Sequence, residues 1–193
     1  MMTNDEAHRW TVWDLFLRTG TAELSDARIP GVQIAPRPPV RALGAARLAV
    51  GRLVRFGLGP LGPEGRNPLE MIAANVGPGD VLSISAEEAS FAVMGSRLAA
   101  RAVVQGASAV VTDGSLRDLS DLARMPMAAW AGSASPSGGE GPGSYVRLDG
   151  PSKLFGLEWQ EGDWYAQDED GALRITPTAL EEIVRIYGKE FRK

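Results

Sequence analysis

The stretch Val110–Asp118 reads VVTDGSLRD, and it indicates more about the fold than any other part of the chain. Its short apolar run predicts a buried strand, and Asp113-Gly114 predicts a turn that ends this strand. Arg117 and Asp118 then follow, so a basic and an acidic side chain adjoin beyond the strand. Because neighbouring side chains in an extended or turning segment point in different directions, one can bind a carboxylate while the other holds a hard cation. An enzyme that acts on 2-oxo acids through a divalent metal needs this combination.

Strands and helices alternate around this stretch. Val81–Ser85 precedes it as an apolar strand, and the Ala-rich segment Arg97–Gln105 predicts a helix that Gly106 ends. Met127–Ala131 predicts the next strand. Such alternation is typical of an α/β domain with parallel pairing. Further expected elements are helices over 5–18, 69–75, 120–123 and a C-terminal apolar stripe (Leu180, Ile183, Val184, Tyr187), strands over 40–56, 145–148, 153–157 and 164–166, and loops over 57–68 and 132–144.

Length and composition restrict the class of protein. The 193 residues, 44% of them hydrophobic and 23% charged, predict one globular domain with a sizeable core. Within this domain, 1–193, we expect an N-terminal helical arm over 1–23, a core over 24–175 and a C-terminal helix over 176–193. The chain has no cysteine and a single histidine, His8. Thiolate sites and disulfides are therefore excluded, and a Ser-His-Asp triad or a multi-histidine zinc site would depend on His8 alone.

The distribution of charge argues against several partners. The formal net charge is −4, and lysines and arginines are dispersed, so the basic footprint of a nucleic-acid-binding protein is missing. Charged residues interrupt every apolar run well short of a membrane span. The first six residues are acidic, unlike a signal peptide. We therefore expect a cytoplasmic protein that binds neither nucleic acid nor membrane.

Four motifs fall in a fixed order. Pro78–Leu82 reads PGDVL, Gly95–Ala99 reads GSRLA, Asp113–Asp118 reads DGSLRD, and the segment 161–171 contains EGDW followed by DEDG. Together they resemble the RraA-like family, which contains the regulator of ribonuclease activity A and the class II 4-hydroxy-4-methyl-2-oxoglutarate aldolases. The resemblance covers about 24–175. It implies a layered α/β sandwich with a central, mostly parallel sheet plus N- and C-terminal helices, assembled as a homotrimer or a hexamer.

In the aldolase branch, the resemblance also implies a pyruvate site beside one Mg²⁺ or Mn²⁺ ion. By position, Arg117 would bind the carboxylate of a 2-oxo acid, and Asp118 would hold the metal. Gly95 and the amides of Ser96, Arg97 and Leu98 would surround the substrate's oxygens at the start of a helix. An arginine matches a carboxylate in shape, and a helix N-terminus presents free N–H groups to an anion. A divalent metal would stabilise the enolate formed when a C–C bond breaks, in aldol cleavage or in oxaloacetate decarboxylation.

Two residues depart from the family pattern. Ser96 stands where the aldolases usually have aspartate, and serine does not act as a general base at neutral pH without help. Arg97 occupies a position that is normally apolar. Three hypotheses remain open at this point: a metal-dependent pyruvate lyase with Arg117, Asp118 and Ser96 at its centre, a non-catalytic regulator that binds a protein partner such as a ribonuclease, and an enzyme for a larger acid whose extra carboxylate Arg97 binds.

Simpler interpretations apply to other polar and aromatic residues. The alternative interpretation of Arg117 and Asp118 is a surface ion pair at a strand end, without a ligand. Trp10 and Trp13 are interpreted as core or subunit-contact residues. The aspartates of the Gly-Asp motifs are interpreted as turn residues without chemistry (Asp80, Asp163, Asp168, Asp170).

Overall fold

The computed structural model describes residues 4–59, 67–86, 89, 91–138 and 144–188, with side chains from Val12 on. The side chains of His8 and Trp10 therefore lie outside the described residues, as do parts of the loops expected over 57–68 and 132–144. The helices are α1 (Asn4–Asp26), α2 (Pro68–Asn75), α3 (Ser96–Val104), α4 (Leu119–Leu122) and α5 (Pro177–Tyr187). The strands are β1 (Val32–Ile34), β2 (Arg41–Ala42), β3 (Ala49–Gly59), β4 (Val81–Ser85), β5 (Ala92–Met94), β6 (Ala109–Leu116), β7 (Ala128–Ala134), β8 (Ser144–Arg147), β9 (Ser152–Leu154), β10 (Leu157–Trp159), β11 (Trp164–Gln167) and β12 (Ala172–Ile175).

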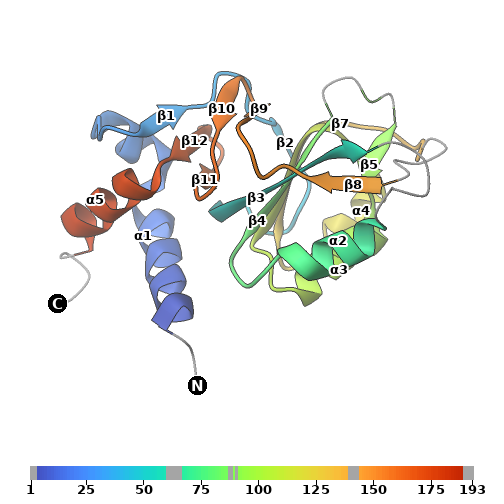
Figure 1. The fold of residues 1–193 in the computed structure, drawn as a ribbon, viewed down its shortest axis with the longest axis horizontal. Helices are drawn as coiled ribbons and strands as arrows, with labels where there is room; N and C mark the ends of the chain where they lie inside the picture. Colours follow the sequence, from blue (N-terminus) through green and yellow to red (C-terminus); the bar gives the residue numbers. More distant parts are fainter. Residues whose placement is uncertain (1–3, 60–66, 87–88, 90, 139–143, 189–193) are drawn as a thin grey trace.

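A ten-stranded sheet organises the chain, and the predicted α/β class is confirmed. Its strand order is β1-β12-β11-β3-β4-β6-β7-β2, with β5 on β6 and β8 on β3. The four adjacent strands β3, β4, β6 and β7 run parallel, whereas the outer strands β1, β2, β8, β11 and β12 pair antiparallel. Helices α2, α3 and α4 lie on one side of these parallel strands (Figure 1). The carboxyl ends of the parallel strands therefore meet at one edge, where open α/β sheets bind their ligands.

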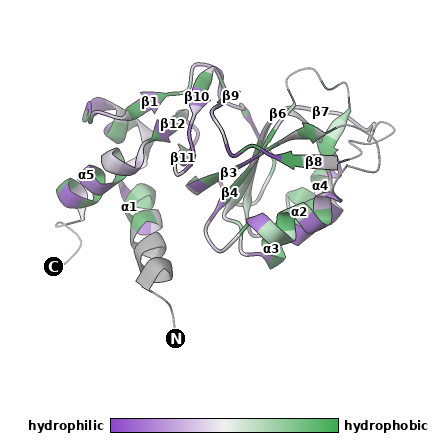
Figure 2. Cartoon of the chain, in the orientation of Figure 1, coloured by the Kyte–Doolittle hydropathy of each residue, from purple (hydrophilic) through white to green (hydrophobic). Residues whose placement is uncertain are grey.

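The face of the sheet beneath these helices is a continuous apolar layer. Register aligns Val54, Leu82, Val110 and Ala129 across the four parallel strands, and all four are buried in one cluster. Buried Met71 and Ile72 of α2, and Ala99 and Ala102 of α3, pack into the same cluster. Figure 2 shows the hydrophobic colouring of the central strands. The prediction that the apolar run of β6 forms a buried strand is therefore confirmed.

The opposite face is covered by the hairpin β9–β10. Its Phe155 and Trp159 pack with Tyr165 of β11, at ring-centroid distances of 5.8 and 5.7 Å. The single strand predicted over 153–157 is wrong, because Phe155 and Gly156 both have positive φ, 53° and 81°, and form the hairpin turn. A buried phenylalanine in the left-handed region has no sequence signal, since that region normally favours glycine or asparagine.

Helices α1 and α5 lie together at one end of the molecule, away from α2–α4 (Figure 1). They pack on β1, β11 and β12 through a third apolar cluster that includes Leu15, Phe16 and Ile183. The predicted N-terminal helix continues to Asp26, but Gly20 interrupts it with φ 72° and ψ 171°. Beyond this kink, the Thr21 amide and hydroxyl donate to the Asp168 carboxylate. No helix in the part of the chain that the structure describes is long and apolar enough to cross a membrane.

Strand β6 is longer than predicted. The turn expected at Asp113-Gly114 is wrong, because β6 continues to Leu116 through an irregularity between Thr112 and Ser115. The Thr112 hydroxyl accepts from the Gly114 amide at 3.0 Å and donates to the Ile84 carbonyl at 2.7 Å. This hydroxyl hydrogen-bonds the backbone where the regular pairing of β6 with β7 is interrupted, as at a β-bulge. The loop expected over 132–144 also begins late, since β7 continues to Ala134.

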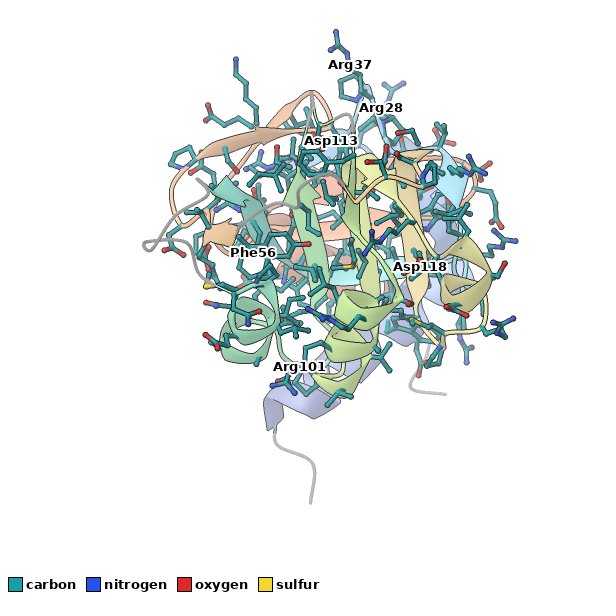
Figure 3. All side chains as sticks on the ribbon, turned by 90° about the vertical axis from the view of Figure 1, so that its right-hand side faces the viewer. Arg28, Arg37, Phe56, Arg101, Asp113 and Asp118 are labelled. Atoms are coloured by element: carbon teal, nitrogen blue, oxygen red, sulfur yellow. The ribbon has the colours of Figure 1, made fainter. Side chains whose placement is uncertain are left out.

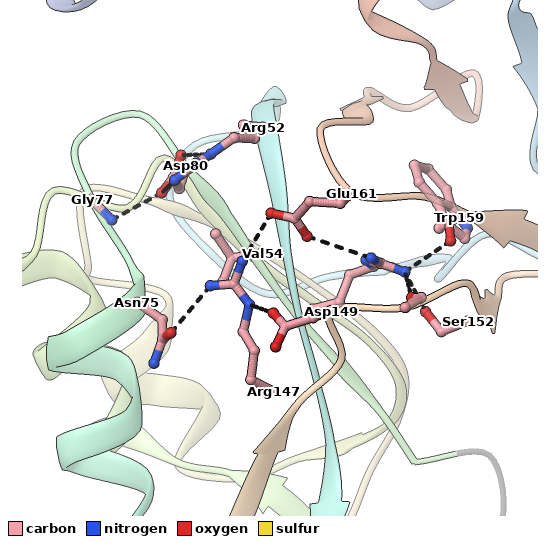
Figure 4. Close-up of polar contacts among 12 residues, drawn as sticks. Arg52, Val54, Asn75, Gly77, Asp80, Arg147, Asp149, Ser152, Trp159 and Glu161 are labelled. Atoms are coloured by element: carbon pink, nitrogen blue, oxygen red, sulfur yellow. Dashed lines mark hydrogen bonds and ion pairs between the residues drawn. The ribbon is translucent and has the colours of Figure 1, made fainter.

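Two aspartates interpreted as turn residues are also buried ion partners. Asp80, which is fully buried, accepts from Arg52 Nε at 3.1 Å and Nη2 at 2.8 Å, and from the Gly77 amide (Figure 4). Asp163 pairs with Arg174 at 2.6 Å. These carboxylates join turns to strands, so they have a structural role.

Candidate functional site

The candidate site lies where β5 and β6 end and α3 begins. Tyr145 of β8 donates its hydroxyl to the Val93 carbonyl at 2.6 Å, and burial raises the pKa of this phenol, so the group stays a neutral donor. The Arg117 amide donates to the Met94 carbonyl at 3.0 Å and so joins the exit of β6 to the end of β5. Gly95 follows as the N-cap of α3. This bond brings the predicted residues 95–98 next to Arg117 and Asp118.

Asp118 is held against the first residue of α3. Its Oδ2 accepts from the Ser96 amide at 2.9 Å and from the Ser96 hydroxyl at 3.0 Å. The backbone supports this placement, because Asp118 adopts a left-handed conformation with φ 58°, which aspartate tolerates better than most residues. The hydrogen bonds from the Ser96 amide and hydroxyl, with the charge of Arg117, lower the pKa of Asp118. The carboxylate is therefore ionised at neutral pH, and its side chain is 38% exposed.

Arg117 lies beside this carboxylate without forming a tight pair. Its Nε is 4.0 Å from Asp118 Oδ2, and its side chain is 47% exposed. A close Arg–carboxylate pair has N–O distances of about 2.7–2.9 Å. The guanidinium thus keeps donors available to an external anion. The structure places the two side chains near each other and near the start of α3, while their predicted division between a carboxylate and a metal stays a prediction.

Gly95 allows the close approach of both side chains. A Cβ built on Gly95 would overlap Asp118 Oδ2 and would lie 2.9 Å from Arg117 Cγ and 3.0 Å from Arg117 Nε. Any side chain at position 95 would displace one of the two charged residues. The glycine is required here by proximity, since its φ of −132° is accessible to every residue.

Arg97 and Leu98 complete the first turn of α3. The side chain of Leu98 packs partly into the apolar layer under the helices. Arg97 is exposed, and its side chain has no hydrogen bond or ion pair within the described part of the chain. The amides of both residues belong to the helix turn whose N–H groups have no partner inside the helix. A cation at this end of a helix opposes the helix dipole but strengthens attraction of an anion.

A divalent metal has one protein ligand available here. Among residues 4–59, 67–86, 89, 91–138 and 144–188, no group of three or more Asp, Glu, His or Cys side chains could hold a metal ion. The Oδ1 atom of Asp118 accepts no hydrogen bond from those residues, and its carboxylate is ionised and partly exposed. Magnesium prefers oxygen ligands and usually keeps several waters, so one carboxylate and a chelating acid suit it. The donor set therefore fits Mg²⁺ or Mn²⁺ weakly bound by the protein alone.

A separate cavity of about 380 Å³ lies at Asp113 and not at Asp118. Arg37, Pro38 and Pro39 form one wall, and the hairpin turn Phe155-Gly156 forms another. Figure 3 shows Arg37 and Asp113 above Asp118, and Arg101 near the opposite end of α3. The sequence did not indicate this cavity, because its walls come from a proline-rich segment and a hairpin tip that are distant in sequence.

Gly138 also adjoins the candidate site, although its sequence context did not predict this. A Cβ built on Gly138 would overlap Arg117 Nη1 and would lie 3.0 Å from Arg117 Cζ. This glycine belongs to the small, polar stretch predicted as a loop, and nothing in its local pattern distinguishes it from its glycine and serine neighbours. Its proximity to Arg117 depends on how β7 ends, which the sequence pattern does not reveal.

Comparison with known proteins agrees with this architecture. A family model described as RraA-like, Aldolase/RraA, matches residues 21–174. The chain belongs to the Aldolase/RraA family. The matched range contains every residue of the candidate site, whereas α5 and the part of α1 up to Gly20 lie outside it.

Individual members of the Aldolase/RraA family differ in the activity that their names state. A 4-hydroxy-4-methyl-2-oxoglutarate aldolase from Thermus thermophilus is 36% identical over 86 residues, which are 44% of this chain and 51% of that protein. The chain thus spans about half the length of the curated relatives it matches. The solved RNA-processing inhibitor RraA from Thermus thermophilus is 29% identical, with a TM-score of 0.67 over 80% of this chain and 91% of that one.

A further solved relative has a third activity in its name. It is an S-adenosylmethionine:2-dimethylmenaquinone methyltransferase from Geobacillus kaustophilus, 25% identical, with a TM-score of 0.70 over 81% of this chain and 94% of that one. Family and fold are therefore shown, and the function has to be argued from the site.

Proposed function

We propose that this chain is a divalent-metal-dependent lyase that cleaves a C–C bond of a 2-oxo acid, of the class II pyruvate aldolase and oxaloacetate decarboxylase type. One observation carries the proposal: Asp118, ionised and bonded to the Ser96 amide, lies 4.0 Å from a half-exposed Arg117 at the start of α3. A cation, an anion and unpaired helix amides thus converge where a parallel sheet ends. The aldolase named among the relatives supports the same class of reaction.

Each residue has a distinct part in this proposal. Arg117 binds the substrate carboxylate, because its guanidinium is planar and keeps donors available. The amides of Arg97 and Leu98 contact the remaining oxygens. Asp118 holds Mg²⁺ or Mn²⁺ through its exposed carboxylate. A bound ion of this kind supplies Lewis-acid stabilisation of the negative charge that develops on the 2-oxo oxygen.

Ser96 positions Asp118 and does not act as a base. Its hydroxyl donates to Asp118 Oδ2, so it holds the carboxylate by the oxygen that faces the helix. The aldolase motif usually has aspartate at this position, and a serine offers no second carboxylate. Water or the substrate's own groups then have to transfer protons at neutral pH, and we expect slow turnover.

The test combines an assay with a binding measurement. With Mg²⁺ present, the protein should release pyruvate from oxaloacetate or 4-hydroxy-4-methyl-2-oxoglutarate, and oxalate with Mg²⁺ should raise its melting temperature. Arg117→Ala should lower kcat/KM by about 10–150-fold, because a hydrogen bond to a charged group contributes about 1.5–3 kcal/mol. Arg101→Ala, at the far end of α3, is the matched control and should behave as wild type. Pyruvate release at background level, together with no melting shift, would refute the lyase proposal.

The second candidate function is a non-catalytic regulator that binds a protein partner such as a ribonuclease. Ser96 favours it, since the position lacks the aldolase carboxylate, and a relative is named as an RNA-processing inhibitor. This candidate predicts a folded protein on which oxalate and Mg²⁺ have no effect. A net charge of −4 would suit docking on a basic surface.

Two narrower expectations accompany the lyase proposal. If the substrate is a larger acid, Arg97 binds its extra carboxylate, and Arg97→Ala changes substrate preference without weakening pyruvate binding. The family resemblance leads us to expect a trimer or a pair of trimers, which light scattering measures directly.

A further inference from the structure

We infer that Gly138 is a positioning residue for Arg117, and this inference rests on the proposed function. A Cβ at position 138 would overlap Arg117 Nη1 and lie 3.0 Å from Cζ. The end of the guanidinium therefore occupies the volume that any side chain at position 138 would need. Gly95 bounds the same side chain nearer its base, where a Cβ would lie 2.9 Å from Cγ and 3.0 Å from Nε. The Arg117 side chain thus passes close to two glycines, Gly95 near its base and Gly138 at its end.

The segment that carries Gly138 is fixed to the two strands of the site. The Ala92 amide of β5 donates to the Ser137 carbonyl at 2.7 Å. The Ser135 amide donates to the Leu116 carbonyl of β6 at 3.1 Å. Position 138 therefore follows directly after a backbone that is hydrogen-bonded on both sides. If a methyl group is added there, we expect the flexible end of Arg117 to move, because the backbone directly before position 138 is held by these bonds.

The cost of this movement falls on function and not on stability. The guanidinium is the far end of a flexible side chain that is 47% exposed, so it can swing into solvent. Gly138 does not have a φ in the left-handed region, so alanine meets no backbone strain there. A misplaced arginine still carries its charge but no longer aligns with a carboxylate held at the α3 N-terminus. Gly138→Ala should therefore weaken binding of 2-oxo acids while the fold stays intact.

Gly150→Ala is the matched control for this experiment. It makes the same chemical change at a glycine whose Cβ would meet nothing within 4 Å. The readouts are the oxalate dissociation constant with Mg²⁺, KM and kcat for oxaloacetate, melting temperature without ligand, and the Arg117 Nε–H resonance in ¹H–¹⁵N NMR spectra. That resonance is assigned by its loss in Arg117→Lys.

We expect Gly138→Ala to raise the oxalate dissociation constant and KM by about ten- to a hundred-fold, to shift the Arg117 resonance, and to leave the melting temperature at that of Gly150→Ala. In the Arg117→Ala background, Gly138→Ala should have no further effect, because the overlapping guanidinium is gone.

Two results would overturn the inference: an unmoved Arg117 resonance in Gly138→Ala, or an equal loss of oxalate affinity when alanine replaces Gly138 in the Arg117→Ala background. Failure of the proposed function has a different signature. In that case the Arg117 resonance still shifts in Gly138→Ala, but wild type and Arg117→Ala respond alike to oxalate and release no pyruvate.

Discussion

Arginine–aspartate pairs of two kinds occur in this fold. Asp80 is fully buried and accepts two hydrogen bonds from Arg52, whereas Asp118 is 38% exposed and lies 4.0 Å from the Nε of its neighbour Arg117. Both aspartates follow short glycine-containing motifs, and both also accept from a backbone amide, Asp80 from Gly77 and Asp118 from Ser96. They differ in how the guanidinium contacts the carboxylate. Arg52 donates from both Nε and Nη2 to Asp80, whereas Arg117 makes no close hydrogen bond to Asp118 and keeps donors for a ligand.

This difference separates a structural pair from a site. Removing one partner of a buried, hydrogen-bonded ion pair lowers stability strongly, because the other charge is then left buried without compensation. An exposed pair at long distance contributes little to stability. This exposed pair, at the carboxyl edge of the sheet and next to helix amides, is the one to which the proposed function assigns an external ligand. The comparison can be tested with matched substitutions in the two pairs.

The largest expected effect on stability comes from the buried pair. Asp80→Asn keeps the shape of the side chain but removes the charge opposite Arg52. Because Arg52 is 38% exposed and can be partly hydrated, we expect the unfolding free energy to fall by about 3 kcal/mol, the lower end for breaking a buried pair. Urea denaturation measures this change. Stabilisation by oxalate and Mg²⁺ should persist in the folded fraction, and its loss would mean that the two regions are not independent.

Asp118→Asn should give the opposite result. The amide can still accept from the Ser96 N–H, so the unfolding free energy should change by less than about 1 kcal/mol. The melting shift produced by oxalate with Mg²⁺ should disappear, since a neutral amide is a poor ligand for this ion. Calorimetric titration with Mg²⁺ and oxalate provides the measurement. If Asp118→Asn instead unfolds the protein as readily as Asp80→Asn, then Asp118 is structural and the comparison fails.

The sequence predicted the parts of this fold that local patterns determine. The apolar run of β6 and the Ala-rich helix α3 follow from burial and periodicity. The match of the motifs to a family placed residues 95–98 beside Arg117 and Asp118, and the structure brings these residues together. Periodicity alone predicts neither this contact nor which of the acidic turns is buried. Asp80 and Asp118 occur in similar short motifs. Their difference in burial cannot be predicted from these motifs, because it depends on strands that are distant along the chain.

Errors arose where tertiary contacts override local signals. Asp113-Gly114 usually ends a strand, but the Thr112 hydroxyl joins the Gly114 amide to the Ile84 carbonyl of β4, and β6 continues. Phe155 adopts φ 53° in a hairpin turn because its ring is buried against Tyr165. Gly138 could not be singled out, since only the path of the chain after β7 brings it to Arg117. In each case the deciding interaction joins segments whose contact the sequence pattern does not encode.

The smallest expected effect concerns the hydroxyl that holds Asp118. Ser96→Ala removes one hydrogen bond to Oδ2 and keeps the bond from the backbone amide, so the pKa of Asp118 should rise only part of the way to its ordinary value. Because the folded-state pKa is lowered, the stabilisation from Asp118 is fully present above the unfolded pKa, about 3.9, and is lost as the pH falls through the folded value.

In Ser96→Ala this loss should be smaller and should be complete at a higher pH than in wild type, and the unfolding free energy at pH 7 should fall by about 0.5 kcal/mol, discounted for exposure. Carboxyl ¹³C NMR titration of Asp118 in the two proteins measures the order of the pKa values. An unchanged pKa would show that the Ser96 amide and the charge of Arg117 lower the pKa of Asp118 without help from the hydroxyl. The hydroxyl would then have no part in holding the carboxylate. The only consequence of serine at position 96 would be the absence of the aldolases' second carboxylate.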